Sequence, residues 1–384
     1  MSGRPATRPD WAAWNASTPF TLGVEEEIMM LDPSDWTLAQ RIDAVLPVLP
    51  AELSAQVAAE THGAAIELTT GVHTAVAGAV GELRRLRRDL AGAIEELGLR
   101  AAAAGTHPTA VWQETEVSSG RRYKFIYGSM RELARREPTF ALHVHVGVPT
   151  PQQGIDLYNR LRGHLPLFLA LSVNSPFWQG RDTGLASART PLFQAFPRVG
   201  MPRHFASYQD YTEAVDLLVR CDAFPEHTFL WWDVRPQPGY GTVEVRIMDS
   251  QTTVEETSAL VALVQAVAKL ELEEGWISNQ LIRLPEVLIE NRFLAARDGM
   301  EGRFIDPDLE RRVPVREQLE RLVEAAMPHA EELGCAGALR GVEDLAERTG
   351  AQRQLEIARG PDRLPGLVRD LAGEFTAEGA RLRT

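Results

Sequence analysis

The sequence predicts an α+β domain in which strands come first and helices follow. Four segments in the first part of the chain alternate apolar and polar side chains with the period of two that is typical of a half-buried strand. These segments are residues 20–31, 64–72, 139–148 and 242–249. Beyond Thr253 the apolar residues recur at helical spacing to the end of the chain. Strands grouped before helices are typical of the α+β class.

The composition is that of an ordinary soluble globular protein. The chain has 384 residues, of which 44% are hydrophobic and 24% are charged, and its formal net charge is −13. A negative surface disfavours nucleic acid and anionic membranes as partners, because both bind basic surfaces. Cys221 and Cys335 lie far apart, so neither a disulfide framework nor a zinc site is indicated. We therefore expect a cytoplasmic protein with small-molecule partners, and a homodimer is left open.

Three regions are expected along the chain. Residues 1–17 are predicted to be a flexible tail, since they begin polar, with arginines and prolines, and lack the apolar run of a signal peptide. Residues 18–300 contain the four alternating strands and are expected to form one domain. Residues 301–384 are predicted to be a helical extension packed on the same domain. No segment approaches the roughly 20 apolar residues that cross a bilayer.

The strand around Glu244 carries opposite charges on one face. Glu244 and Arg246 point the same way, whereas the aliphatic residues between and beside them point to the other face. The same alternation places polar side chains on one face of the other strands, namely Glu25, Glu27, Glu67, His143 and His145. We therefore predict that carboxylates, imidazoles and a guanidinium meet on one surface of the sheet.

Alternatives remain open for several of these features. The acidic run from Glu25 to Glu27 fits either an exposed edge strand protected by charge or a metal or substrate site. Two histidines on one face favour function, although a single one is more often a core residue. Arginines 84, 85, 87 and 88 of the helix expected at 75–97 are predicted to be solvated. The basic segment 121–136 fits a surface helix, which we favour, or a mobile segment near an anionic substrate.

The residue types indicate hard metal-ion chemistry. Carboxylates with histidines and without cysteine suit Mg²⁺ or Mn²⁺, and such ions most often hold nucleotide phosphates. Arg246 is placed to stabilise charge as a phosphate bond breaks. The sequence has no Walker loop and no dinucleotide glycine pattern, so a nucleotide site would be built on the sheet. The absence of a serine nucleophile elbow disfavours a Ser-His-Asp hydrolase.

Six short motifs, in order over about residues 18–300, resemble those of the glutamate-cysteine ligase type 2, or carboxylate-amine ligase, family. The motifs are Gly23-Val24-Glu25-Glu26-Glu27, Glu67-Leu68-Thr69-Thr70-Gly71-Val72, Gly105-Thr106-His107-Pro108, His143-Val144-His145-Val146, Trp232-Asp233-Val234-Arg235-Pro236 and Thr242-Val243-Glu244-Val245-Arg246-Ile247-Met248-Asp249. The resemblance implies a glutamine synthetase-like fold: a curved, mainly antiparallel sheet that binds ATP and divalent metals on its concave face, with helices on its convex side.

The resemblance also implies roles for individual residues. The implied Mg²⁺ ligands are Glu25, Glu27, Glu67, His143 and Glu244. Arg246 is expected to contact phosphate, with Arg235 also on the nucleotide. Arg235, His145 and Glu60 are expected on the substrate side, and Glu60 is also a candidate ligand. Arg246, Glu244 and Glu27 are the expected catalytic residues.

The implied reaction is ATP-dependent amide formation through an acyl phosphate. In the family the acid is typically glutamate and the amine cysteine, but His73 and Asp298 differ from the residues expected in relatives, which leaves both substrates open. Two rivals remain: a metal-dependent amide hydrolase on the same scaffold, and a non-catalytic small-molecule binding protein.

Overall fold

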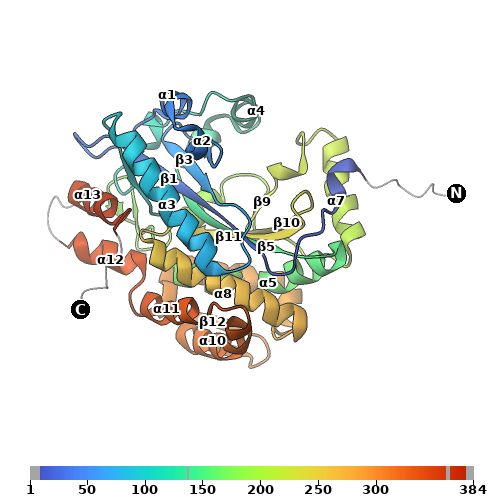
Figure 1. Cartoon of the computed structure of the whole chain (residues 1–384). Helices are drawn as coiled ribbons and strands as arrows, with labels where there is room; N and C mark the ends of the chain where they lie inside the picture. Colours follow the sequence, from blue (N-terminus) through green and yellow to red (C-terminus); the bar gives the residue numbers. More distant parts are fainter. Residues whose placement is uncertain (1–8, 136–137, 360–363, 378–384) are drawn as a thin grey trace.

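A single antiparallel sheet of seven strands organises the fold (Figure 1). The computed structural model describes residues 9–135, 138–359 and 364–377. The strand order is β10-β11-β5-β1-β3-β2, and β4 pairs with the end of β1. The strands are β1 (Leu22–Leu31), β2 (Val57–Ala59), β3 (Ala65–Thr69), β4 (Arg100–Ala102), β5 (Ala141–Gly147), β10 (Val234–Gln237) and β11 (Thr242–Asp249). The four predicted strands and the α+β class are confirmed.

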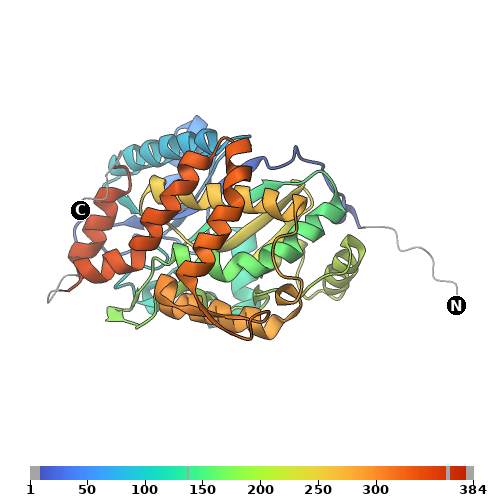
Figure 2. The same cartoon turned by 90° about the horizontal axis from the view of Figure 1, so that it is seen from below.

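Helices cover one face of this sheet in two layers (Figures 1 and 2). The inner layer comprises α3 (Val76–Glu95), α5 (Pro151–Ser172) and α8 (Val254–Glu273), which contact strands β1, β11 and β5 respectively. Outside α8 lie α10 (Val315–Glu332) and α11 (Ala336–Glu347). Helix α8 is apolar around most of its circumference because it is buried between the sheet and these outer helices. A capping box formed by Thr253 and Glu256 begins it.

The remaining elements lie around the edges of these layers. The helices are α1 (Ile42–Val45), α2 (Ala51–Ser54), α4 (Arg121–Met130), α6 (Arg189–Phe193), α7 (Tyr208–Arg220), α9 (Pro285–Asp298), α12 (Gly350–Ile357) and α13 (Leu364–Glu374). The short strands are β6 (Phe177–Trp178), β7 (Arg181–Asp182), β8 (Val199–Gly200) and β9 (Trp231–Trp232). No helix in the described ranges is both long and apolar enough to cross a membrane.

The prediction that the chain is entirely helical after Thr253 is wrong. A hairpin of β12 (Arg303–Asp306) and β13 (Arg311–Pro314) interrupts the helices. Its buried Phe304 and Val313 face each other across the pair of strands. Each strand has only four residues, so its apolar alternation cannot be distinguished from helical spacing in the sequence. Helix α9 begins at Pro285, whose fixed φ suits the first position of a helix.

Residues 9–17, which were expected to belong to a flexible tail, pack against the body of the protein. The indole Nε1 of Trp14 donates to the carbonyl of Val148 at 3.0 Å. Asn15 and Ser17 donate to the carbonyls of Gly239 and Tyr240, each at 2.8 Å. This part of the prediction needs correction, and residues 1–8 lie outside the described residues.

Arg87 is buried, so the prediction that all four arginines of α3 are solvated is wrong for this residue. The Arg87 guanidinium donates to both carboxylate oxygens of Glu26 at 2.8 Å. It also donates to the carbonyls of Gln251 and Thr252 at 2.8 and 2.9 Å. Glu26 has no exposed surface and faces the helices, opposite to its neighbours Glu25 and Glu27. This ion pair therefore fixes β1 to α3 and to the segment before α8.

We predict that Arg87→Ala lowers the free energy of unfolding by about 3–5 kcal/mol, because it leaves the Glu26 carboxylate buried without a cation. Urea unfolding followed by circular dichroism would measure the loss. The matched control is Arg84→Ala on the same helix, which removes only the solvent-exposed ion pair with Glu255, with an expected change of at most about 1 kcal/mol. Equal effects of the two substitutions would contradict a structural role for the buried pair.

Candidate active site

The strand register brings the predicted polar side chains together on the face opposite to the helices. Glu25 lies directly across from His143 on β5. On the other side of β1, Glu27 lies across from Glu67 on β3. Glu244 on β11 lies between His145 of β5 and Arg235 of β10. Five adjacent strands thus place their polar and charged residues side by side, and the alternation of the sequence predicts this for all of them except β10.

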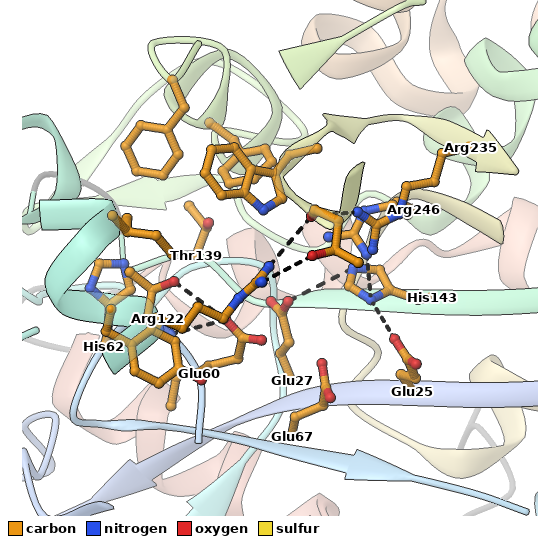
Figure 3. A pocket seen from close by; sticks show the side chains of 18 of the residues that line it. Glu25, Glu27, Glu60, His62, Glu67, Arg122, Thr139, His143, Arg235 and Arg246 are labelled. Atoms are coloured by element: carbon orange, nitrogen blue, oxygen red, sulfur yellow. Dashed lines mark hydrogen bonds and ion pairs between the residues drawn. The ribbon is translucent and has the colours of Figure 1, made fainter. Parts of the chain in front are cut away.

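A cavity of about 350 Å³ lies over these strands (Figure 3). All the predicted site residues line it except Glu244, which lies beneath Arg246 and Arg235 and contacts both. Helix α4, helix α6 and the segment before β9 form the remaining walls. The lining side chains that the sequence did not single out as site residues include His62, Arg122, Tyr123, Ile126, Met130, Arg189, Phe193, Phe196, Glu226, Thr228, Trp231 and Tyr240.

Two groups of three side chains have ligand atoms within 4.8 Å of one another: Glu25, His143 and Glu244, and Glu27, Glu67 and His143. His143 joins the groups, because its Nδ1 lies 3.1 Å from Glu25 and its Nε2 lies 3.8 Å from Glu27. Oxygen ligands with one imidazole suit hard divalent cations. The described residues therefore contain two adjoining places that fit such an ion.

Glu27 and Glu67 carry negative charge that the protein compensates poorly. Burial, followed by the charge of Glu60, raises the pKa of Glu27 to about 7. Burial and the charges of Glu25, Glu60 and Glu27 raise the pKa of Glu67 well above its ordinary value. Carboxylates in such a position bind either protons or cations. The donor set and its charge therefore fit a divalent metal ion.

Glu244 has the opposite environment. Its buried carboxylate accepts from Nε of Arg235 at 2.6 Å, from Gln237 at 2.8 Å and from Arg246. Burial raises the pKa of Glu244, but the charges of Arg235 and Arg246 outweigh it and hold the pKa well below its ordinary value. Glu244 is therefore an ionised anchor for two guanidinium groups as well as a neighbour of His143.

The two histidines differ in charge. Burial and the nearby Arg246 lower the pKa of His143 to about 4, so this imidazole is neutral and able to bind a metal. Burial also lowers the pKa of His145, but Glu25 and Glu244 outweigh it and raise the pKa above its usual range. The His145 Nε2 lies 3.3 Å from Glu25, and the raised pKa favours the cationic form, which stabilises the acidic cluster.

Helix α4 contributes Arg122, which the favoured assignment as a surface helix did not predict. The segment is helical, but Arg122 lines the cavity and donates to Glu226 at 2.8 Å and to Thr228 at 3.0 Å. Arg189 is the first residue of α6 and lies within the long connection between α5 and α7. The position of such a connection relative to a site cannot be predicted from the local sequence pattern alone.

The motif residue His107 has a structural role instead. Its Nδ1 accepts from the backbone N–H groups of Thr109 and Ala110 at 3.2 and 3.0 Å. Burial lowers the pKa of His107 to about 4, which keeps it a neutral acceptor. It caps a turn and is absent from the cavity lining.

Residues 21–369 match the family model described as glutamate-cysteine ligase family 2. The chain belongs to this family. Among curated relatives, "Putative glutamate--cysteine ligase 2-1" of Rubrobacter xylanophilus is 40% identical over 88% of this chain and 90% of its own length. A protein named in the same way from Sorangium cellulosum is 38% identical over 92% of this chain and 95% of its own length. The recognised motifs thus lie within a family likeness that covers almost the whole chain.

Solved structures confirm the predicted glutamine synthetase-like fold for this member of glutamate-cysteine ligase family 2. A glutamate-cysteine ligase from Francisella tularensis in complex with AMP has a TM-score of 0.65 at 14% identity, covering 95% of this chain and 91% of its own. A bifunctional glutathione synthetase from Pasteurella multocida has a TM-score of 0.70 at 10% identity, covering 93% of this chain and 52% of its own. At these identities the likeness concerns the fold.

We predict that Mg²⁺ binding releases protons and strengthens between pH 6 and pH 8. A pKa of about 7 means that Glu27 holds a proton near pH 6, which a cation must displace, and the pKa of Glu67 is raised in the same direction. Calorimetric titration in buffers of different ionisation enthalpy would count the protons released.

The variant Glu27→Gln should release fewer protons near pH 7, whereas the exposed Glu52→Gln should match the wild type. Affinity and proton release that stay constant across this pH range would contradict the description of the acidic cluster.

Proposed function

We propose that this protein is an ATP-dependent carboxylate-amine ligase that joins the side-chain carboxylate of glutamate to the amine of an amino acid through an acyl phosphate. The observation that carries the proposal is the juxtaposition of undercompensated carboxylates, Glu27 and Glu67, with the Arg246 guanidinium in one cavity. Membership of a ligase family supports the same chemistry.

The cation site is proposed to hold Mg²⁺ or Mn²⁺. Glu25, Glu27, Glu67, His143 and Glu244 would be its ligands, and Glu60 lines the same cavity. When bound, the ions would neutralise phosphate oxygens and orient the nucleotide. The residues supply oxygen and neutral imidazole donors, the types that these ions prefer.

Arg246 is the proposed phosphate contact. Its Nη1 is held by Glu244, while its Nε is buried without a hydrogen-bond partner among the described residues. A buried N–H without an acceptor costs free energy, so an anion at this position would be stabilised. Arg246 thus offers a fixed positive charge where negative charge develops on the transferred phosphoryl group.

Arg235 is better suited to positioning than to substrate contact, contrary to the expectation from sequence. Its guanidinium donates to both oxygens of Glu244 and to the carbonyls of Thr228 and Leu230. Few donors remain for a ligand. We propose that it holds Glu244 in place and thereby supports Arg246.

The proposed reaction has two displacement steps. A carboxylate oxygen of the acid attacks the terminal phosphorus of ATP, and the bond between that phosphorus and the ADP oxygen breaks. The amine nitrogen then attacks the acyl carbon and loses a proton, and the C–O bond breaks to release phosphate. The released phosphate therefore carries one oxygen from the acid. The rival amide hydrolase would need no nucleotide.

We predict that ¹⁸O in the acid carboxylate appears in inorganic phosphate, one atom for each amide formed. Mass spectrometry of phosphate would measure it after purified protein is incubated with ATP, Mg²⁺, labelled glutamate and a panel of amino acids. A reaction without amine controls for slow hydrolysis of the acyl phosphate.

Coupled ADP release over the same panel identifies the amine. Amide formation that yields unlabelled phosphate, or turnover without ATP, would exclude the acyl-phosphate route.

A further inference from the structure

Arg246 is one of the two residues that form a β-bulge in β11. Val245 pairs with Val144, and the next pair is Met248 with Leu142, so Arg246 and Ile247 together oppose the single residue His143. In a regular strand Met248 would share the polar face with Glu244 and Arg246. The bulge turns Met248 into the core instead, where it is fully buried.

Arg189 donates hydrogen bonds to the backbone carbonyls of both residues of the bulge. Its Nη1 donates to the carbonyl of Ile247 at 3.0 Å, and its Nη2 donates to the carbonyl of Arg246 at 3.2 Å. Buried carbonyls need donors, and a guanidinium fork can reach two neighbouring acceptors at once. Arg189 is 6% exposed, so water competes little for these hydrogen bonds.

Arg189 is itself fixed to the end of the same strand. Asp249 accepts from the hydroxyls of Ser175 and Ser187 at 2.7 and 3.0 Å. Both serines lie in the segment that precedes α6. Ser175 also accepts from the backbone N–H of Arg189 at 3.2 Å. The start of α6 and the bulge therefore form one hydrogen-bonded unit behind Arg246.

We propose that Arg189 is a positioning residue that holds the β11 bulge and thereby aims Arg246 into the cavity. This inference rests on the proposed function only where it concerns turnover. The alternative is direct contact with a substrate anion, since Arg189 also lines the cavity and its Nε is buried without a hydrogen-bond partner among the described residues. The two roles differ in their dependence on Arg246.

The first test compares Arg189→Met with Arg162→Met. Arg162 is a matched control, because it is equally buried and donates to two backbone carbonyls, those of Pro202 and Ile282, but is absent from the cavity lining. We expect both variants to lose stability, and only Arg189→Met to lower kcat, by about 10- to 100-fold, as a misplaced charged group does. The KM for the acid should change by less than about 3-fold, since uniform substrate binding is retained.

A double-mutant cycle decides between the two roles. If Arg189 acts through Arg246, then adding Arg189→Met to Arg246→Met should lower kcat by less than about 2-fold further. Independent, multiplicative losses, or a KM effect that exceeds the kcat effect, would overturn the proposal in favour of direct contact. An unchanged kcat in Arg189→Met would overturn it as well. Arg189→Lys, which keeps the charge but can satisfy the carbonyls less completely, replaces the methionine variant if that one does not fold.

Amide hydrogen exchange provides a readout that does not need turnover. Peptides containing Arg246 and Ile247 should exchange faster in Arg189→Met than in wild type or Arg162→Met, whereas β1 peptides should not. Unchanged exchange at the bulge would contradict the proposal even if activity fell. If the wild-type protein released no ADP with any acid and amine, the proposed function would fall, and the exchange result would still decide whether Arg189 holds the bulge.

Discussion

The rest of the site depends on how β1 separates its three consecutive glutamates. Because side chains alternate along a strand, Glu25 and Glu27 face the cavity while Glu26 faces the helices. On the face that the helices cover, below the sheet, Arg87 compensates the charge of Glu26 with a bidentate ion pair. Above it, Glu27 faces Glu67 and has no comparable cation in direct contact among the described residues. The same strand thus carries one charge that holds the fold together and others that remain for a ligand.

The arginines divide the site into an acidic half and a basic half. Glu244 binds Arg235 and Arg246 and keeps both guanidinium groups on the β10–β11 side. On the β1–β3 side, carboxylates crowd together and their pKa values rise. His143 lies at the boundary and is neutral, so it neither adds to the repulsion nor cancels it. A ligand that carries both cations and phosphate oxygens would complement the two halves at once.

Much of the sheet side of this arrangement is predictable from sequence, because a period of two assigns each strand residue to a face once the strand is recognised. Glu25, Glu27, Glu67, His143 and Glu244 follow from that rule together with the family motifs. Arg189 does not, because its position depends on the path of a loop and on a bulge that disturbs the alternation. Arg87 escapes prediction for another reason: helical spacing places it on the helix but does not reveal the acid beneath it. The β12–β13 hairpin is too short for its alternation to stand out among helices.

The net charge of −13 bears on the order in which the proposed ligands bind. ATP and a carboxylic acid are both anions, and the acidic protein repels them at long range. Arg246 and Arg235 already share the charge of Glu244, so they cannot reverse the potential of the β1–β3 half. Divalent cations at Glu25, Glu27, Glu67 and His143 would reverse it locally. We therefore expect cations to bind before the nucleotide or with it, and the phosphate to reach Arg246 only after the acidic half has been neutralised.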